Sequence, residues 1–334
     1  MNSRKSAVLV VALLAALAVS QTVQAQQTWQ ATLGAQNKDM GKQAIAFLPN
    51  EMWIHVGDSI NWTSATGEMH TVTFLAAGQA YTNFHVGCPG FATTSPVSFN
   101  GSTCASTPPL TQGQSFAVKF TKTGNYKLVC LVHSHMTGVI HVLATSAALP
   151  HNQAFYNDEA ADQTKSILAD ADHGHGDHDD MDDMLSAHVI PGKNSVVAGT
   201  GEMAATGAGF QSLSVQRFMS GTIEVRVGDT VEWTNLDPAE PHTVTFGTEP
   251  ANPTPPSINV TLDPDGARHA TLSSTSDSAH SGFLVAAPQD QVGVPQTPPG
   301  VTVFRVTFTG AGTYDYICAL HDTLGMVGKV IVKP

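Results

Sequence analysis

The sequence predicts an all-β protein made of two β-sandwiches or barrels in tandem. A chain of 334 residues is long enough for about two domains, and it contains the same unit twice. Short alternating strands with turn signals, together with 29 glycines and 19 prolines, are typical of a turn-rich β protein. Hydrophobic residues make up 42% and charged residues only 13%, which excludes a disordered chain dominated by charge.

The N-terminus has the three parts of a secretory signal peptide. Residues 1–5 are basic, residues 7–19 are apolar, and a small-x-Ala cleavage site ends at Ala25. The apolar run is shorter than the roughly 20 residues that span a bilayer. We therefore expect residues 1–25 to be removed, leaving a secreted or periplasmic protein with no transmembrane segment. An uncleaved membrane anchor is the alternative.

The repeated unit begins with two alternating strands joined by a Gly-Asp turn. The second strand ends on a tryptophan, at Trp62 in one copy and at Trp233 in the other. The pentapeptide His-Thr-Val-Thr-Phe follows in both copies, and each copy later reaches a cysteine through a Gly-x-Tyr strand. These matches predict one domain over residues 26–146 and a second over residues 194–334.

Between the two domains lies a linker over residues 147–193. Its start, Gln153 to Ala171, has helix-forming residues and no strong breaker, so we expect a short helix there. An acidic run from Asp170 to Met184 then has no periodic apolar face and is predicted to be flexible. Its histidines and methionines could bind copper or zinc loosely; a solvated acidic spacer is the equal alternative.

Each domain carries the side chains of a blue-copper site. One histidine, in the pentapeptide, is followed much later by a cysteine, a histidine and a methionine close together, at residues 130–136 and 318–326. Two imidazoles and a thiolate in a plane, with a weak axial thioether, form the mononuclear blue-copper site. A strand that delivers the cysteine and a tight loop that returns the other two ligands would bring these groups to one metal ion.

Both units resemble cupredoxins, the small blue copper proteins. The Cys-x2-His-x4-Met cluster of the second unit is similar to that of plastocyanin and pseudoazurin. The Cys-x2-His-x2-Met cluster of the first resembles that of amicyanin. The resemblance covers both domains apart from the inserted loops, and it implies two Greek-key cupredoxin domains with two type 1 copper ions per chain. The ligands that it implies are His70, Cys130, His133 and Met136, and His242, Cys318, His321 and Met326.

Two observations qualify this assignment of the ligands. His135 also lies near Cys130, but His133 is preferred because it has the same Cys+3 position as His321. Thr71 and Thr243 stand where plastocyanins and amicyanins usually have an asparagine that ties the ligand loops together, so the redox potentials are left open.

The remaining cysteines and histidines are given structural roles. Cys88 and Cys104 are expected to form a disulfide, which an oxidising compartment allows; two free thiols are the alternative. Closing this loop would contribute on the order of 3 kcal/mol. Histidines that match no motif position are expected to be surface or structural residues, among them His55, His85, His141, His269 and His280.

Three function classes compete. A net charge of −12 disfavours a nucleic-acid binder. Multicopper enzymes place a histidine directly beside the copper cysteine, whereas aliphatic residues flank both Cys130 and Cys318. We therefore expect no enzyme but an electron carrier that serves redox partner proteins. An envelope copper-binding or storage protein, or a copper-resistance protein, is the alternative.

Overall fold

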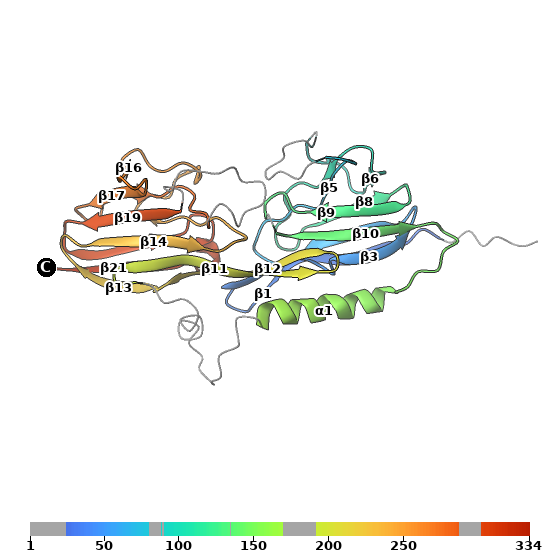
Figure 1. The fold of residues 1–334 in the computed structure, drawn as a ribbon, viewed down its shortest axis with the longest axis horizontal. Coiled ribbons are helices and arrows are strands. Elements are labelled where there is room, and N and C mark those ends of the chain that lie inside the picture. The colour runs from blue at the N-terminus through green and yellow to red at the C-terminus, as the bar shows by residue number, and fades with distance from the viewer. Residues whose placement is uncertain (1–24, 80–87, 89, 134, 170–191, 287–301) are drawn as a thin grey trace, which may run out of the picture.

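The computed structural model describes residues 25–79, 88, 90–133, 135–169, 192–286 and 302–334. It is mostly β, with two β units placed end to end and one helix lying along the first unit (Figure 1). The predicted all-β class with two units is confirmed. The predicted signal peptide and the acidic run lie outside the described residues, apart from Ala25.

The strands of the N-terminal unit form one face of a sandwich and part of a larger sheet. One five-stranded sheet has the order β3-β10-β9-β5-β7. The strands of this unit are β1 (Thr28–Gln36), β2 (Lys42–Leu48), β3 (Glu51–His55), β4 (Ser59–Ser64), β5 (Thr73–Phe74), β6 (Val97–Phe99), β7 (Ala105–Ser106), β8 (Ser115–Phe120), β9 (Gly124–Val129) and β10 (Thr137–Leu143).

The C-terminal unit repeats this arrangement. Its own five-stranded sheet has the order β13-β21-β20-β15-β18. A short 3-10 helix at Asp322–Leu324 lies between its last two strands. The strands are β11 (Ser195–Thr206), β12 (Gly209–Met219), β13 (Thr222–Arg226), β14 (Thr230–Leu236), β15 (Thr245–Phe246), β16 (Thr261–Leu262), β17 (Arg268–Leu272), β18 (Ala279–His280), β19 (Val303–Phe308), β20 (Gly312–Ile317) and β21 (Val327–Lys333).

A third sheet runs through both units and joins them. It has eleven strands in the order β16-β17-β19-β14-β11-β12-β2-β1-β4-β8-β6. The junction is β12, which pairs with β11 on one side and with β2 on the other, in register from Ser212 opposite Ile45 to Val215 opposite Lys42. Alternation in single strands predicts sandwiches but does not reveal that two of them share a sheet.

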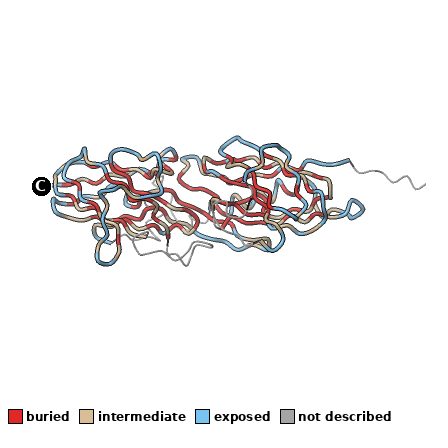
Figure 2. Tube along the Cα trace, turned by 90° about the horizontal axis from the view of Figure 1, so that it is seen from above, coloured by how far each residue is buried: buried red, intermediate tan, exposed pale blue. Residues whose placement is uncertain are grey.

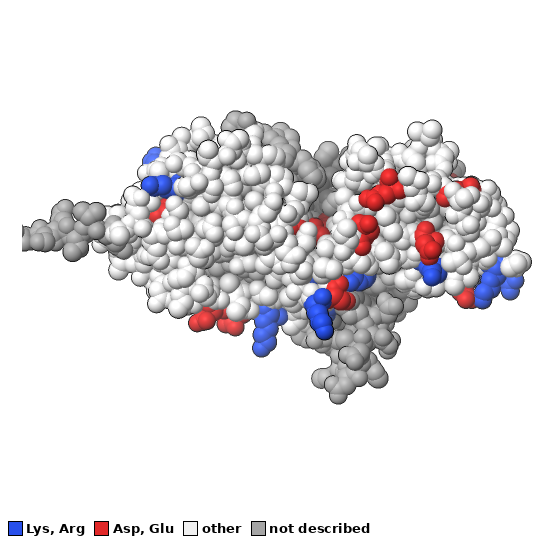
Figure 3. Space-filling view, turned by 180° about the vertical axis from the view of Figure 1, so that it is seen from behind, with Lys and Arg blue, Asp and Glu red and all other residues white. Residues whose placement is uncertain are grey.

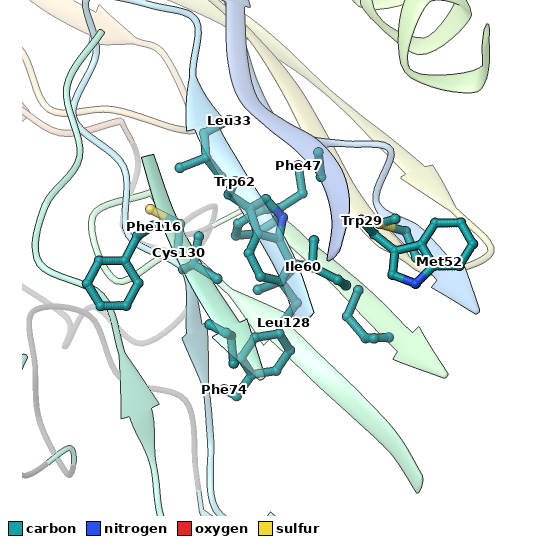
Figure 4. Packing of buried hydrophobic residues seen from close by; sticks show 14 of the residues in the cluster. Trp29, Leu33, Phe47, Met52, Ile60, Trp62, Phe74, Phe116, Leu128 and Cys130 are labelled. Atoms are coloured by element: carbon teal, nitrogen blue, oxygen red, sulfur yellow. The ribbon is translucent and has the colours of Figure 1, made fainter. Parts of the chain in front are cut away.

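Each unit has its own aromatic core. The strands that end the Gly-Asp hairpins alternate buried and part-exposed residues, and Trp62 and Trp233 are completely buried in them. Figure 2 shows the buried chain running through the middle of both units. Figure 4 shows Cys130 at one end of the first core and Trp29 and Met52 at the other, so the core directly supports that cysteine.

The predicted helix is confirmed as α1 (Gln153–Ala169), which packs against β1, β2 and β12. The side-chain oxygen of Asn152 accepts the Phe155 N–H and caps its first turn. Tyr156 anchors the helix, because its hydroxyl donates to the Trp53 carbonyl at 3.0 Å and accepts the Trp53 N–H at 2.8 Å. Among the described residues, no helix combines the length and the apolar character that crossing a membrane requires.

The Cys88–Cys104 disulfide is present, as predicted, and Cys130 and Cys318 are buried and take no part in a disulfide. The disulfide attaches the residues before β7 to the loop that contains Cys88. The two cysteines predicted to bind metal are therefore not used in the disulfide.

Candidate metal centres

The first centre brings His70, Cys130 and His133 together. His70 lies just before β5, Cys130 follows β9 directly, and His133 lies in the loop between β9 and β10. The two imidazole Nδ1 atoms are 3.0 Å apart, and Cys130 Sγ is 3.6 Å from His133 Nδ1. All three side chains are buried, and one donor atom from each lies within 4.8 Å of the others. The three groups can therefore reach one ion.

The second centre has the same geometry in the C-terminal unit. His242 precedes β15, Cys318 follows β20, and His321 lies in the loop before β21. Here the Nδ1 atoms are again 3.0 Å apart, and Cys318 Sγ lies 3.5 Å from His321 Nδ1 and 4.0 Å from His242 Nδ1. The structure thus groups the side chains that the repeat analysis paired.

Each predicted methionine ligand closes its ligand loop. Met136 and Met326 are completely buried. The Met136 carbonyl accepts the Cys130 N–H at 3.0 Å, and the Met326 carbonyl accepts the Cys318 N–H at the same distance. This bond holds the methionine beside the cysteine whether the loop between them is short or long. Its role as fourth ligand remains a prediction.

The threonine after each first histidine ties the two ligand segments together. The Thr71 N–H donates to Cys130 Sγ at 3.4 Å, and Thr71 Oγ1 accepts the Leu131 N–H at 2.8 Å. In the second unit, Thr243 makes the same two bonds, to Cys318 Sγ at 3.3 Å and from the Ala319 N–H at 2.7 Å. Threonine therefore ties the two ligand segments together at the position where an asparagine was expected, and the redox potentials stay open.

A glycine lies against each first histidine. Gly34 (φ +62°) and Gly199 (φ +80°) both occur where the register of their strand shifts, as in a β-bulge. A Cβ at Gly34 would lie 2.7 Å from His70 Nε2, and one at Gly199 would lie 2.1 Å from His242 Nε2. The left-handed backbone and the close approach both require glycine, so these bulges help to position the imidazoles.

The environment of each cysteine favours the thiolate in the metal-free protein. Burial raises the pKa of Cys130, but the neighbouring His133 outweighs it, and the net pKa lies well below its usual range. The pKa of Cys318 is likewise well below normal, because His321 and His242 outweigh its burial. The thiolate is the form that binds metal, so a metal ion would have to displace protons from the histidines and not from the cysteines.

Two buried glutamates, which the sequence analysis missed, lie between the two centres. Glu240 approaches the second ligand histidine of each centre. Its Oε2 atom lies 3.0 Å from His321 Nε2, and its Oε1 atom lies 3.6 Å from His133 Nε2. Glu68 lies 3.6 Å from His321 Nε2 and 3.9 Å from His133 Nε2. Gln216 on β12 donates through Nε2 to both carboxylates, at 2.8 Å to Glu68 and 3.0 Å to Glu240.

The two carboxylates differ in their electrostatics. Burial raises the pKa of Glu68, and the adjacent Glu240 raises it further. Burial also opposes ionisation of Glu240, but His133 and His321 outweigh it and lower its pKa to about 2. A sequence signal for both residues exists, because each copy reads Glu-x-His at the first ligand. Glu240 is thus the anion of the cluster.

The Nε2 atoms of His70 and His242, the first ligand histidine of each centre, have different surroundings. His242 Nε2 lies 3.2 Å from Asp237 Oδ2. Burial lowers the pKa of His242, but Asp237 and Cys318 outweigh it and raise the pKa to about 9. Within the described residues, His70 Nε2 has no hydrogen-bond partner. The C-terminal site therefore holds its first histidine with an additional acidic contact.

The other histidines stay outside the two groups. His135 is buried and its ring meets Phe210 edge-on, with ring centres 6.1 Å apart, so among the described residues it does not join the Cys130 group. Four of the five histidines that were expected to be surface or structural residues hydrogen-bond to ordinary protein groups: His55, His141, His269 and His280. His85 lies outside the described residues.

Comparison with known proteins agrees with this geometry. Residues 35–143 and 204–333 match the family of copper binding proteins described as the plastocyanin/azurin family. Together these regions cover more than half of the chain, so the protein belongs to this family of copper-binding cupredoxins.

Individual relatives match single units. The chloroplastic plastocyanin of Tetradesmus obliquus is 30% identical over 116 residues, which are 35% of this chain and 58% of that protein. The chain thus spans less than two thirds of this curated relative. A reduced amicyanin variant is 19% identical, with 35% of this chain and 82% of the other covered and a TM-score of 0.24. An oxidised amicyanin variant is also 19% identical, with 34% and 81% covered and the same TM-score.

The donor sets fit copper. A buried thiolate selects soft ions, and two imidazoles suit both Cu(I) and Cu(II), so each group can keep copper in either oxidation state. The described residues thus contain two His-Cys-His groups that are consistent with copper sites, one in each cupredoxin unit.

Proposed function

We propose that this protein is an exported electron carrier with two type 1 copper centres. The observation that carries the proposal is the repetition of one buried His-Cys-His group in two cupredoxin units, each with a Thr N–H bonded to the cysteine sulfur. The ligands would be His70, Cys130, His133 and Met136 in one centre, and His242, Cys318, His321 and Met326 in the other.

Copper would supply one-electron exchange between Cu(II) and Cu(I). The protein contributes a set of buried donors held in place by hydrogen bonds. The Thr71 and Thr243 bonds and the methionine carbonyls hold the cysteines in place, and the surrounding cores exclude water. A site that needs little rearrangement when its charge changes favours fast electron transfer over storage.

An enzymatic role is less well supported. No histidine is adjacent in sequence to Cys130 or Cys318, so neither centre has the covalent connection that multicopper enzymes use to reach a second catalytic metal. We therefore infer a carrier whose substrates are redox partner proteins. The N-terminal 25 residues support export, and a mature protein that begins at Gln26 by mass spectrometry would test it.

The charge distribution supports a protein partner rather than a nucleic acid. The chain carries 27 acidic and 15 basic residues. Figure 3 shows scattered charges on one face of the described residues, sparse over the N-terminal unit, with no continuous basic patch there. Tight binding to phosphate needs such a patch.

Anaerobic spectroelectrochemistry of the copper-loaded protein tests the proposal. We expect two bound copper ions per chain, intense visible absorption and reversible one-electron bleaching of both centres. Copper that exchanges readily with chelators but cycles poorly would favour the alternative, a copper-storage or copper-resistance protein.

A further inference from the structure

The second ligand histidine of each centre, His133 or His321, lies at the boundary between the two units, where its Nε2 atom is near the same two carboxylates. His133 and His321 are only 2% and 4% exposed. If each imidazole binds copper through Nδ1, the atom that lies near its cysteine, then Nε2 carries the N–H and needs an acceptor. The carboxylates within reach of both Nε2 atoms belong to Glu240 and Glu68.

These contacts cross between the units. Glu68 belongs to the N-terminal unit, yet it lies closer to His321 of the C-terminal unit, at 3.6 Å, than to His133, at 3.9 Å. Glu240 of the C-terminal unit contacts both histidines. Each centre therefore has acidic neighbours that come from the other unit.

The boundary is built to keep this arrangement fixed. Strand β12 pairs with β2 of the first unit, and residues of both units share a buried apolar cluster that includes Ala46 and Leu213. Arg217 adds a clamp, donating to the Leu324 carbonyl in the second ligand loop at 2.9 Å and to the Asp39 carbonyl of the first unit at 2.7 Å. The two centres cannot separate without breaking this shared sheet.

The charges of the cluster match those of the two centres. A divalent copper with one thiolate carries one net positive charge, and a monovalent copper with one thiolate carries none. A buried anion needs a nearby positive charge. A carboxylate placed between two such centres stabilises the oxidised state of both, since a unit charge a few ångströms away in a buried site interacts strongly.

We propose that Glu240, with Glu68 and Gln216, joins the two copper centres into one coupled redox unit in which electrons pass between the centres inside the protein. This inference rests on the proposed function. In each transfer one centre loses the electron that the other gains, and no bond is formed or broken. The path runs from His133 through Glu240 to His321, entirely through buried groups.

A third metal ion in this cluster is the competing interpretation. Glu68, His133 and Glu240 offer donor atoms that lie within 4.8 Å of one another. However, His133 could bind such an ion through Nε2 only by losing its second N–H proton while Nδ1 holds copper. The hydrogen-bonding bridge needs no such step and is the interpretation we adopt.

Single-site variants test the coupling across the boundary. In a Cys130→Ser background only the C-terminal centre is coloured, and we expect Glu240→Gln to raise its reduction potential. Glu68→Gln should change that potential much less, because Glu240 is the anion of the cluster. In a Cys318→Ser background, Glu240→Gln should raise the potential of the N-terminal centre. Glu51→Gln is the matched control, because Glu51 pairs with His141 at 2.9 Å, away from both centres. An unchanged potential in the Glu240→Gln variant of either background would overturn the proposal.

Two further measurements complete the test. In the diamagnetic Cu(I) protein, Glu240→Gln should shift the Nε2–H resonances of both His133 and His321, whereas a shift of His321 alone contradicts a shared bridge. After a brief light-driven reduction of one centre in the unsubstituted protein, redistribution of the electron should not depend on protein concentration. A rate proportional to concentration would show exchange between molecules instead.

Metal counting separates the remaining outcomes. Two copper ions per chain that persist in Glu240→Gln support the bridge, whereas a third ion lost in that variant overturns it. Failure of either single-site variant to cycle reversibly would count against the electron-carrier function itself. Reversible cycling without any cross-boundary effect would count against the coupling alone.

Discussion

Glu240 of the C-terminal unit lies 3.6 Å from His133 of the N-terminal unit, and both side chains are buried. This contact places an acidic group of one cupredoxin unit against a candidate copper ligand of the other. The two repeats are therefore not independent copies joined by a tether, since each centre is completed at the boundary they share.

Thr71→Val tests how the first centre is held. The substitution keeps the shape and the backbone N–H but removes Oγ1, which accepts the buried Leu131 N–H. We expect an unsatisfied donor to cost about 1–3 kcal/mol of unfolding free energy, and the visible band of the N-terminal centre to shift. Thr71→Ser, measured by the same denaturant titration and spectrum, should restore most of both. An unaltered band and stability in Thr71→Val would show that the bond does not hold the ligand loop.

Gly199→Ala should damage the C-terminal centre and spare the other. An added Cβ would lie 2.1 Å from His242 Nε2, on a backbone with φ +80°. The imidazole must move, so we expect copper per chain to fall from two to about one. Gly228→Ala is the control, since Gly228 also has a positive φ, of +94°, but nothing lies within 4 Å of an added Cβ. Equal copper loss in the two variants would mean that backbone strain, and not the contact with His242, is responsible.

The sequence was sufficient to predict the two His-Cys-His groups, but not the two glutamates that lie between them. Cysteine and second histidine are three residues apart in both copies, so local chain geometry alone keeps Cys130 near His133. Glu68 and Glu240, by contrast, acquire their role only when the two units pack together. Glu-x-His in both copies was visible, but a glutamate in a loop is normally exposed.

The shared sheet was missed for a similar reason. Alternation identifies which face of a strand is buried, but it does not say which strand lies alongside. Strand β12 pairs with β2 of the other unit through backbone hydrogen bonds that any sequence could make. The helix α1 was predictable because its residues lack breakers, whereas its docking through Tyr156 depends on the fold of the first unit.

Tyr156→Phe tests that docking. The ring would remain against Trp29, but the Trp53 N–H and carbonyl would both lose their bonds to the hydroxyl. We expect the free energy of unfolding to fall by about 1–3 kcal/mol, with no change in the copper spectrum. Tyr126→Phe, whose hydroxyl binds the Lys122 carbonyl at an exposed position, should cost much less. Equal losses in chemical denaturation would contradict a specific anchoring role for Tyr156.

The central claim is that the chain holds two blue copper centres, each dependent on its own cysteine. The most direct measurement is the visible absorption and copper content of Cys130→Ser, Cys318→Ser and the double variant, since a serine oxygen cannot replace the thiolate that produces the colour. We expect each single variant to keep about half of the absorption, and the double variant to be colourless but folded by circular dichroism. Full blue intensity in either single variant would contradict the account, because one of the two groups would then hold no blue copper.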